Sequence, residues 1–252
     1  MRTHHSDKDK YQKPQLLDQA RELATFVQSL SVVDIQSAMK LSESMAEKTR
    51  LLFVDWSIKP EAQTPAIDAF LGDIYSGLQV QTFSSDDRKY ANEHLFILSG
   101  LYGVLSALDS IVPYRLEMGY RFAKAPYKSL FSFWSNTTIA KCIPTTEPII
   151  NLSAEEYTKA VLPHIPDVRV VSPRFLSRDP TTGEPKFVVV HAKIARGAFA
   201  RWLIQQRITD LDTLKNFSDL GYRFDTELST PDQPVFICNQ FQGLGLSVRL
   251  TA

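Results

Sequence analysis

Leu98-Ser-Gly-Leu-Tyr-Gly-Val-Leu-Ser-Ala-Leu-Asp-Ser-Ile-Val-Pro-Tyr-Arg-Leu-Glu-Met-Gly119 is the stretch that decides the fold. It opens with apolar residues typical of a buried strand and continues as an irregular segment that contains Asp109, Arg115 and Glu117. Connections between elements are usually short and polar, whereas this one is long and mixes aromatic and apolar residues with charges. We therefore expect the segment to be held in place for a functional purpose.

The composition is that of an ordinary globular protein with a sizeable core. The 252 residues are 44% apolar and 22% charged, enough for one large or two small domains. Lys plus Arg and Asp plus Glu each number 28, so the formal net charge is zero. A nucleic-acid partner would therefore need a local basic patch, because the field of the whole molecule gives no attraction.

Cysteine usage and hydropathy indicate a cytoplasmic protein without a membrane partner. Cys142 and Cys238 lie far apart and form no Cys-x-x-Cys motif, which favours a reducing compartment. No apolar run approaches the ~20 residues that span a bilayer. Residues 1–10 are polar and lack the hydrophobic core of a signal peptide. Residues 1–13 are expected to form a disordered tail.

Helical spacing and capping residues predict helices near the start of the chain. Apolar positions recur with a helical period over residues 15–30. Ser31 and Asp34 fit an N-terminal capping box. Two short helices joined by the tight turn Lys40-Leu-Ser42 are therefore expected over residues 31–56.

The rest of the chain mixes helices and strands without a regular βαβ rhythm. Further helices are predicted at residues 67–71, from 84, at 127–143, 155–161, 193–207 and 211–217, with a turn at 72–77. Strands are predicted at residues 95–98, 148–152, 168–176, 187–190, 222–227 and 235–239. The turn Asp179-Pro-Thr-Thr-Gly183 should join the third and fourth strands as an antiparallel hairpin. The predicted fold is mixed α/β (α+β), a single domain over residues 14–252 with a mixed sheet and surrounding helices.

The helix predicted at residues 193–207 separates apolar from basic positions. Its basic side contains Lys193, Arg196, Gly197, Arg201 and Arg207. This side could be an anion-binding face on which arginine forks grip phosphate oxygens, or simply a solvated face over a packed one. Because Gly197 has no side chain, a phosphate or a neighbouring backbone could approach it closely.

Two further groups of polar residues could line a cleft. The stretch from residue 98 to residue 119 contains the first group, Asp109, Tyr114, Arg115 and Glu117. These side chains could form a buried ion-pair network, or they could act as binding or acid–base groups. The second group lies where a predicted strand turns into a helix, a location that ligands favour, and comprises Asn151, Glu155, Glu156, Tyr157 and Lys159. Its two glutamates could equally complement the helix dipole.

Standard catalytic and metal-binding motifs are absent from the sequence. Ser99-Gly-Leu-Tyr-Gly103 lacks the glycine that precedes the serine of a nucleophile elbow. There is no phosphate loop and no Gly-x-Gly-x-x-Gly turn, and the five histidines show no metal-ligand spacing. No catalytic residue, metal or cofactor is predicted.

Several segments together resemble the YaaA family of peroxide stress proteins. They occur in the family's order from roughly residue 30 to 240, which makes the set specific. The matching pieces are Gly72-Asp-Ile-Tyr-Ser-Gly-Leu78, Leu98-Ser-Gly-Leu-Tyr-Gly-Val-Leu105, Leu108-Asp109, Pro113-Tyr-Arg-Leu-Glu-Met-Gly119, Phe133-Trp134, Asn151-Leu-Ser-Ala-Glu-Glu-Tyr157 with Lys159, Ala192-Lys193, Ala195-Arg-Gly197 with Arg201, and Gly221-Tyr222.

The resemblance implies a cytosolic, non-enzymatic protein that helps cells to survive hydrogen peroxide, in the family by limiting intracellular free iron. It also implies a helix-hairpin-helix element, here at residues 31–56, and a positively charged cleft suited to DNA. Such a hairpin binds phosphate through backbone N–H groups without reading sequence. We therefore expect sequence-independent DNA binding. The residues expected to contact the anion are Lys40, Arg115, Lys193, Arg196, Gly197 and Arg201.

The chain departs from the family pattern in three places. The hairpin turn Lys40-Leu-Ser42 has no glycine, residues 1–30 contain no apolar strand ending in Ser-Pro-Ala-Lys, and Ser106-Ala107 replaces a basic-Pro pair. The last two differences remove positive charge from the expected cleft. An alternative function therefore stays open, that of an enzyme or small-molecule binder with a polar cleft. Its candidate residues are Asp109, Arg115, Glu117 and Asn151, with Tyr114, Glu156 and Lys159 beside them.

Overall fold

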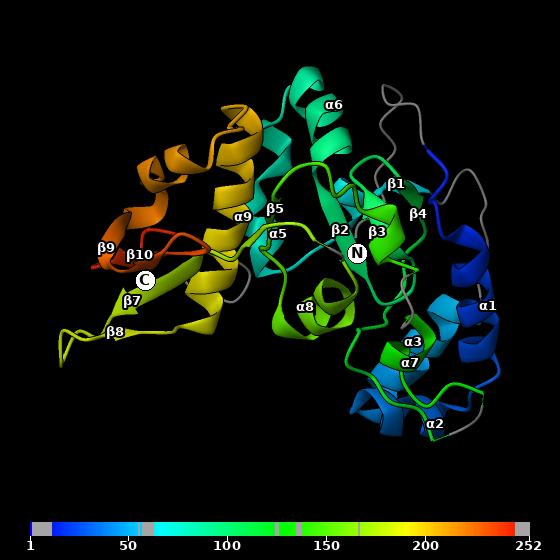
Figure 1. Ribbon diagram of the computed structural model, residues 1–252. Coiled ribbons are helices and arrows are strands. Elements are labelled where there is room, and N and C mark those ends of the chain that lie inside the picture. Colours follow the sequence, from blue (N-terminus) through cyan, green and yellow to red (C-terminus); the bar gives the residue numbers. More distant parts are fainter. Residues whose placement is uncertain are drawn as a thin grey trace. The chain divides into compact units, whose positions relative to one another are not determined.

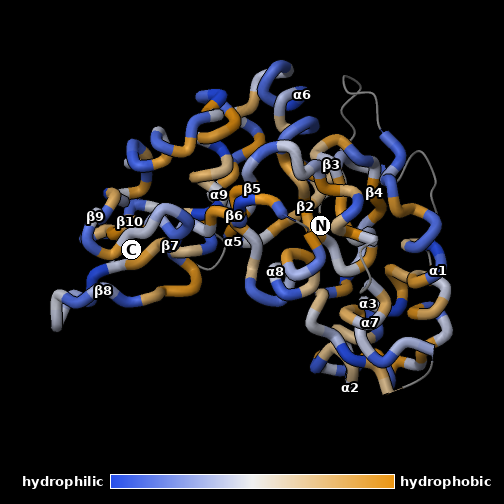
Figure 2. Tube along the Cα trace, in the orientation of Figure 1, coloured by the Kyte–Doolittle hydropathy of each residue, from blue (hydrophilic) through white to orange (hydrophobic). Residues whose placement is uncertain are grey.

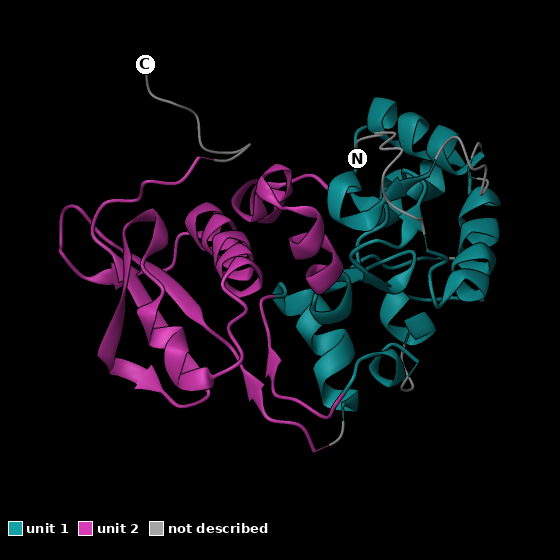
Figure 3. Cartoon of the chain, turned by 90° about the horizontal axis from the view of Figure 1, so that it is seen from above, with its two compact units in different colours: residues 1–69, 92–144, 153–166 teal, residues 70–91, 145–152, 167–252 magenta. Residues whose placement is uncertain are grey.

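The computed structural model describes residues 1, 12–54, 56, 63–123, 126–134, 138–165 and 167–244. Most of the expected disordered tail, residues 2–11, lies outside the described residues. Packing divides the chain into two compact units (Figure 3). Unit 1 contains residues 1–69, 92–144 and 153–166, and unit 2 contains residues 70–91, 145–152 and 167–252. Helices and several small mixed sheets confirm the α+β class, while the single domain stays a prediction.

Unit 1 begins with the three helices that spacing and caps predicted. The helix α1 (Leu17–Gln28) buries one apolar stripe. The next, α2 (Val32–Met39), opens with a reciprocal capping box between Ser31 and Asp34, and it packs on α3 (Glu43–Val54). Lys40 ends α2 with a φ of 51°. The expected helix pair is therefore present, and the left-handed position that usually belongs to glycine is filled by a lysine.

The stretch from residue 98 to residue 119 folds back on itself in unit 1. Strand β2 (Phe96–Ser99) pairs antiparallel with β3 (Gly103–Ser106), and β4 (Ser110–Ile111) pairs antiparallel with β1 (Thr64–Pro65). The expectation of an irregular segment directly after the first strand is therefore wrong as far as Ile111. From Val112 to Gly119 the chain has neither helix nor strand.

The other elements of unit 1 are short. They are α4 (Ala66–Ala69), α7 (Leu130–Trp134), η3 (Ala140–Cys142), α8 (Glu155–Val161) and η4 (Leu162–His164). The continuous helix expected at residues 127–143 is found only as α7 and η3, and residues 135–137 lie outside the described part of the chain. Trp134 is 2% exposed, and its indole N–H donates to the carbonyl of Gly100 at 2.8 Å. This bond fastens α7 to the turn of the β2–β3 hairpin.

Unit 2 contains a four-stranded mixed sheet. Its strand order is β8 (Pro185–Lys186), β7 (Arg174–Arg178), β10 (Gln233–Cys238) and β9 (Tyr222–Thr230). Strand β10 runs parallel to β7 and antiparallel to β9. The predicted hairpin across residues 179–183 is confirmed, since β7 and β8 pair antiparallel there. A separate parallel pair joins β5 (Ile149–Ile150) to β6 (Val170–Val171).

The long helix α9 (Val189–Gln205) lies beside this sheet (Figure 1). The strand expected at residues 187–190 is wrong, because α9 already begins at Val189 and its β-branched first turn imitates a strand in the sequence. The turn expected at residues 72–77 is also wrong. Those residues belong mostly to the helix α5 (Asp73–Leu78), which packs on α9.

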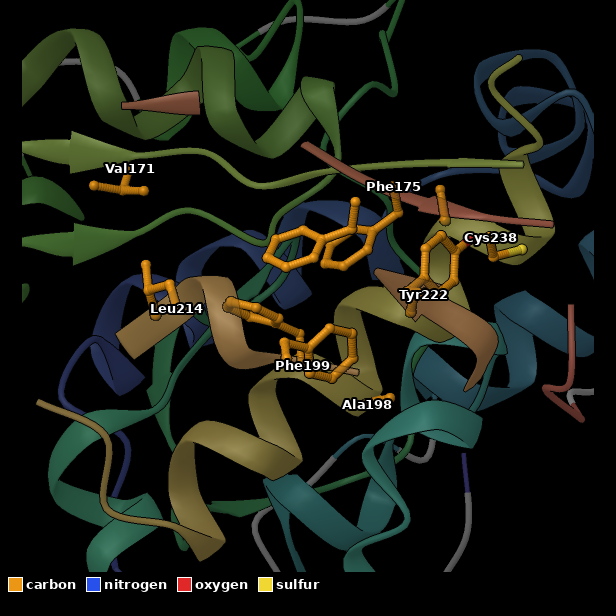
Figure 4. Packing of buried hydrophobic residues seen from close by; sticks show 11 residues of the cluster. Val171, Phe175, Ala198, Phe199, Leu214, Tyr222 and Cys238 are labelled. Carbon is orange, nitrogen blue, oxygen red and sulfur yellow. The ribbon is translucent and has the colours of Figure 1, made fainter. Parts of the chain in front are cut away.

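The core between sheet and α9 is aromatic (Figure 4). Phe175 of β7 stacks on Phe236 of β10 with ring centroids 5.4 Å apart. Phe199 of α9 lies 5.7 Å from Phe175, and Phe217 lies 4.9 Å from Phe199. Burial of each such ring stabilises the fold by roughly 1.5–3 kcal/mol. The hydropathy colouring of Figure 2 shows hydrophilic segments beside the pale tip of the β7–β8 hairpin, away from this core.

Short helical segments complete unit 2. They are η2 (Val80–Thr82), α6 (Ser85–His94, whose last three residues are assigned to unit 1), η5 (Leu211–Asn216) and η6 (Asp219–Gly221). The helix predicted from Ser84 is confirmed as α6. Ser84 and Asp87 form a reciprocal capping box at its start, with the Ser84 N–H donating to the Asp87 carboxylate at 3.0 Å and the Asp87 N–H donating to Ser84 Oγ at 3.1 Å.

Candidate anion-binding site

The helix α9 has three sides with different neighbours. One side packs into the aromatic core through Ala195, Ala198 and Phe199. A second side faces α5, and the third carries Lys193 and Arg196. The basic side that the sequence predicted is therefore divided between two environments.

Gly197 lies at the crossing of α9 and α5. A Cβ atom on Gly197 would lie 1.8 Å from the carbonyl oxygen of Ile74, and one on Gly77 would lie 1.9 Å from the carbonyl oxygen of Ile194. The close approach at Gly197 is thus made by a neighbouring backbone, one of the two possibilities that the sequence left open. Because that space is filled, we remove Gly197 from the set of anion contacts.

The arginines nearer the end of α9 are paired with carboxylates. Arg201 donates from Nη2 to Asp219 Oδ2 at 2.5 Å, and its side chain is only 13% exposed. Arg207 pairs with Asp87 at 2.8 Å and lies over the ring of Tyr90, 4.4 Å from its centroid. The charge of Arg201 is therefore largely neutralised where phosphate contact was expected.

Lys193 and Arg196 remain as the basic positions on the third side, which we call the α9 flank. Lys193 is exposed and has no ion pair among the described residues. Arg196 is half-buried, and this burial lowers the pKa of its guanidinium. A partly desolvated guanidinium binds an anion more strongly than a fully hydrated one does.

Unit 1 brings four predicted cleft residues into one network, which we call the Glu156 cluster. It consists of Arg115, Glu117, Gly119, Tyr120, Glu156 and Tyr157. The Gly119 N–H donates to Glu156 Oε2 at 3.0 Å, and the Tyr120 hydroxyl is hydrogen-bonded to both Arg115 and Glu117. The network ties the irregular segment to the first turn of α8.

Two tyrosines of this cluster are held in their protonated form. Burial raises the pKa of Tyr157, and the negative charges of Glu156 and Glu117 raise it further. Burial and the charge of Glu117 also raise the pKa of Tyr120, against the opposing effect of Arg115. The tyrosines therefore act as hydrogen-bonding groups near neutral pH. Tyr120 was missed in the sequence because nothing in its spacing distinguishes it from a core aromatic residue.

Asp109 and Tyr114 belong to other hydrogen-bond networks of unit 1. The Ser106 N–H donates to Asp109 Oδ2 at 2.8 Å, so this carboxylate closes the turn after β3. Tyr114 is buried, and its hydroxyl lies 2.6 Å from Ser99 Oγ. Burial raises the pKa of Asp109 to about 6. Asp109 also lines a cavity of about 200 Å³, together with Ser106 and Cys142.

The remaining predicted residues lie apart from these networks. Lys159 pairs with Glu155 at 2.6 Å on the exposed side of α8. Lys40 is exposed at the end of α2. Asn151 follows β5 in unit 2, where its side-chain amide donates to Ser172 Oγ at 3.2 Å. A cleft shared by Asp109, Arg115 and Asn151 therefore stays a prediction.

Sequence reasoning also missed three arginines of the unit 2 sheet. Arg174 and Arg178 lie at the ends of β7, and Arg223 lies in β9. The signal was available in part, since Arg174-Phe-Leu-Ser-Arg178 places both arginines on one side of a strand. That Arg223 shares their side depends on strand pairing, which the sequence does not reveal.

Within the described ranges the cysteines are unpaired and possible metal ligands are not clustered. No group of three or more His, Cys, Asp or Glu side chains in these ranges is placed to hold a metal ion. No helix within them is long and apolar enough to cross a membrane. Cys142 and Cys238 are both free thiols.

Comparisons with known proteins agree with the family that the sequence resembles. A family model described as peroxide stress protein YaaA matches residues 1–228. A UPF0246 protein from Salinispora tropica is 52% identical over 236 residues, which cover 94% of this chain and 89% of that protein. The family name associates this chain with oxidative stress. The fold, the ordered motifs and both matches together show that the chain belongs to the YaaA family of peroxide stress proteins.

Proposed function

We propose that this protein acts in the response to hydrogen peroxide by binding DNA through phosphate contacts, without catalysing a reaction. The observation that carries the proposal is the α9 flank. Lys193 and Arg196 lie about one helical turn apart on α9, and neither belongs to the crossing with α5 at Gly197 or to the aromatic core. Cations at this spacing contact phosphate oxygens without reading bases.

Fluorescence anisotropy with a labelled 20-base-pair duplex tests the proposal. Wild-type protein is compared with a Lys193→Ala, Arg196→Ala double variant over a series of salt concentrations. Loss of two phosphate contacts should reduce the slope of log K against log salt by ~2. A matched control replaces two other cations of unit 2, Lys215→Ala and Arg169→Gln. Arg169 pairs with Asp232 at 2.8 Å, so its charge is already compensated.

The salt slopes of the wild type and the two variants decide between the possible explanations. A reduced slope for the α9 variant, with an unchanged slope for the control, supports DNA binding through this flank. Equal slopes for the wild type and both variants would overturn the flank as the contact. Absence of binding by the wild type at low salt would overturn DNA binding itself.

We further propose that this activity is linked to limiting intracellular free iron. Family membership and the resemblance of the motifs support the link. The test measures chelatable iron by electron paramagnetic resonance in cells that carry or lack the gene, after hydrogen peroxide is added. Equal iron levels in the two strains would contradict the proposal.

Small-molecule binding is a second candidate function, favoured by the cavity beside Asp109. Its volume of about 200 Å³ suits a compact polar ligand, and Ser106, Asp109 and Cys142 supply polar atoms. Thermal shift assays with small amines, carboxylates and nucleotides test this function, with Asp109→Asn as the control. A compound that raises the melting temperature of the wild type alone supports it, and equal shifts in both proteins would contradict it.

A further inference from the structure

The four-stranded sheet of unit 2 has two faces of different character. Phe175 and Ser177 of β7 point toward α9, because Phe175 packs against Phe199 and Ser177 Oγ lies 2.8 Å from His191 Nδ1. Side chains alternate along a strand. Arg174, Leu176 and Arg178 therefore lie on the other face, which we call the second face.

The neighbouring strands follow the same alternation. Phe236 and Cys238 of β10 belong to the aromatic core, so Val235 and Ile237 lie on the second face. In β9, Tyr222 belongs to that core, and the register pairs Arg223 with Ile237 and Asp225 with Val235. The second face thus includes seven residues that the register defines: Arg174, Leu176 and Arg178 of β7, Val235 and Ile237 of β10, and Arg223 and Asp225 of β9.

A small apolar strip lies at the centre of the second face. Leu176, Val235 and Ile237 form a buried cluster of their own. Within the described ranges, no hydrophobic residue of another element packs against this cluster. Leu176 and Ile237 are nevertheless only 7% exposed. Arginine stems can cover apolar surface while the guanidinium stays in water, and exposed arginines flank the strip on β7 and β9.

The arginines of the second face have no ion-pair partner in the part of the chain that the structure describes. None of Arg174, Arg178 and Arg223 forms an ion pair with a described carboxylate. Arg178 donates instead to the Asn239 side chain at 3.1 Å and to the Gly183 carbonyl at 2.8 Å. Arg223 donates to the carbonyls of Ser218 and Tyr222, each at 2.8 Å. These bonds orient two guanidinium groups and leave their charge available.

The carboxylate of Asp225 on the second face has a local role. Asp225 Oδ1 accepts the Leu228 N–H at 2.9 Å, which closes the turn inside β9. The register places Asp225 in the row of Val235 and Arg174, with β10 between it and β7. The defined residues of the second face therefore carry three positive charges and one negative charge.

The spread of the arginines selects the kind of ligand. Arg174 and Arg178 are four residues apart on β7, which corresponds to ~13 Å, and two strand spacings place Arg223 ~10 Å across the sheet. A polymer of repeated negative charges matches arginines whose backbone positions are spread this widely. None of the seven defining residues is aromatic, so the second face offers no ring for a base to stack on.

We infer that the second face binds the phosphodiester backbone of a nucleic acid, as a contact surface separate from the α9 flank. Arginine forks suit phosphate oxygens, and a face without aromatic rings recognises the backbone independently of sequence. The inference rests on the proposed function in one respect, that a nucleic acid is the partner. It names different residues, so the two proposals can fail separately.

The experiment compares three variants by fluorescence anisotropy over a salt series. The sheet variant carries Arg174→Gln, Arg178→Gln and Arg223→Gln, and the rescue variant carries lysine at the same three positions. The α9 variant carries Lys193→Ala and Arg196→Ala. The probes are labelled 20-nucleotide single-stranded DNA, the same sequence as RNA, and the DNA duplex, which together show which polymer supplies the phosphates. Arg169→Gln is the single-site control, and circular dichroism and melting curves establish that each variant is folded.

The sheet variant should lose ~2 from the magnitude of the single-strand salt slope, and ~3 on the duplex. The rescue variant should restore the slope, because lysine keeps the charge and the stem. If the sheet variant has the wild-type slope on every probe, the inference is overturned, and a loss confined to the α9 variant then upholds the proposed function alone. A loss confined to the sheet variant supports the inference and overturns the α9 flank. Failure of the wild type to bind any probe overturns both.

Discussion

Gly77 and Gly197 lie at the crossing of α5 and α9, and each occupies a position that has no room for a side chain. The backbone carbonyl of Ile194 fills the space beside Gly77, and that of Ile74 fills the space beside Gly197. The contact is reciprocal, so the two helices approach each other by their backbones. Both glycines belong to the ordered motifs of the family, and here their purpose is packing.

Replacement of Gly197 by alanine should destabilise unit 2. The added methyl group would meet backbone atoms, which cannot move aside as a flexible side chain can, and we expect a loss of about 3 kcal/mol in the free energy of unfolding. Urea denaturation measures the loss. Gly183→Ala is the control, because nothing lies within 4 Å of its absent Cβ and only its φ of +73° opposes alanine, at a cost of about 1 kcal/mol. Equal losses for the two variants would contradict the crossing as the cause.

Asp109 should make the protein less stable as the pH rises from about 4 to about 6. Its pKa is about 6 in the folded state, against an ordinary value of 3.8. Between these values the folded protein holds a proton that the unfolded chain has released, so the free energy of unfolding falls with rising pH, by at most about 3 kcal/mol. Asp109→Asn keeps an acceptor for the Ser106 N–H and removes the charge. Urea midpoints at several pH values should show a flatter profile for this variant, and a profile parallel to that of the wild type would contradict the assignment.

Arg201 should matter for stability and little for DNA. Its pair with Asp219 is shielded on the arginine side, and Arg201→Met should cost about 1–2 kcal/mol because Asp219 loses its partner. The salt slope for duplex binding should change by much less than the loss of one phosphate contact would cause. Thermal melting and anisotropy on the same sample check both statements. If the slope falls by the amount expected for one phosphate contact while stability is unchanged, Arg201 belongs to the anion-binding residues after all.

Ser84 should stabilise the start of α6 by capping. Its hydroxyl accepts the Asp87 N–H, and Asp87 returns a bond to the Ser84 N–H while also pairing with Arg207. Ser84→Ala should therefore cost about 1 kcal/mol. Ser85→Ala, one residue later and exposed, serves as the neutral comparison. Chemical denaturation of the two variants should differ, and identical midpoints would argue against the cap.

Local signals in the sequence predicted local structure well. The capping boxes at Ser31 and Ser84 and the hairpin turn after β7 involve residues only a few positions apart, so their chemistry is legible without the fold. The first turn of α9 misled because Val189 and Val190 favour strands locally, whereas here they extend a helix whose later residues pack into the core. The packed part of the helix outweighs the local preference of its exposed first residue.

Long-range relations account for what the sequence could not show about the site. The basic side of α9 is visible as a helical pattern, but Asp219 and the α5 backbone, which occupy half of it, come from distant parts of the chain. Arg223 joins Arg174 on one face only through β10, and the parallel pairing of β7 with β10 links residues about sixty positions apart. The charge pattern of the sequence therefore identified the basic side of α9. The second face became visible only from the strand register of the structure.

The position of β10 in the sheet has a consequence for biosynthesis. This strand lies between β7 and β9, and it supplies Val235 and Ile237 to one face and Phe236 and Cys238 to the other. A ribosome makes it after every other strand of the sheet, so β7 has no partner on that side until residues 233–238 emerge. During that interval Phe175 and Phe199 are without the ring of Phe236. Nascent chains stalled ahead of β10 should therefore engage chaperones, and those released after it should not.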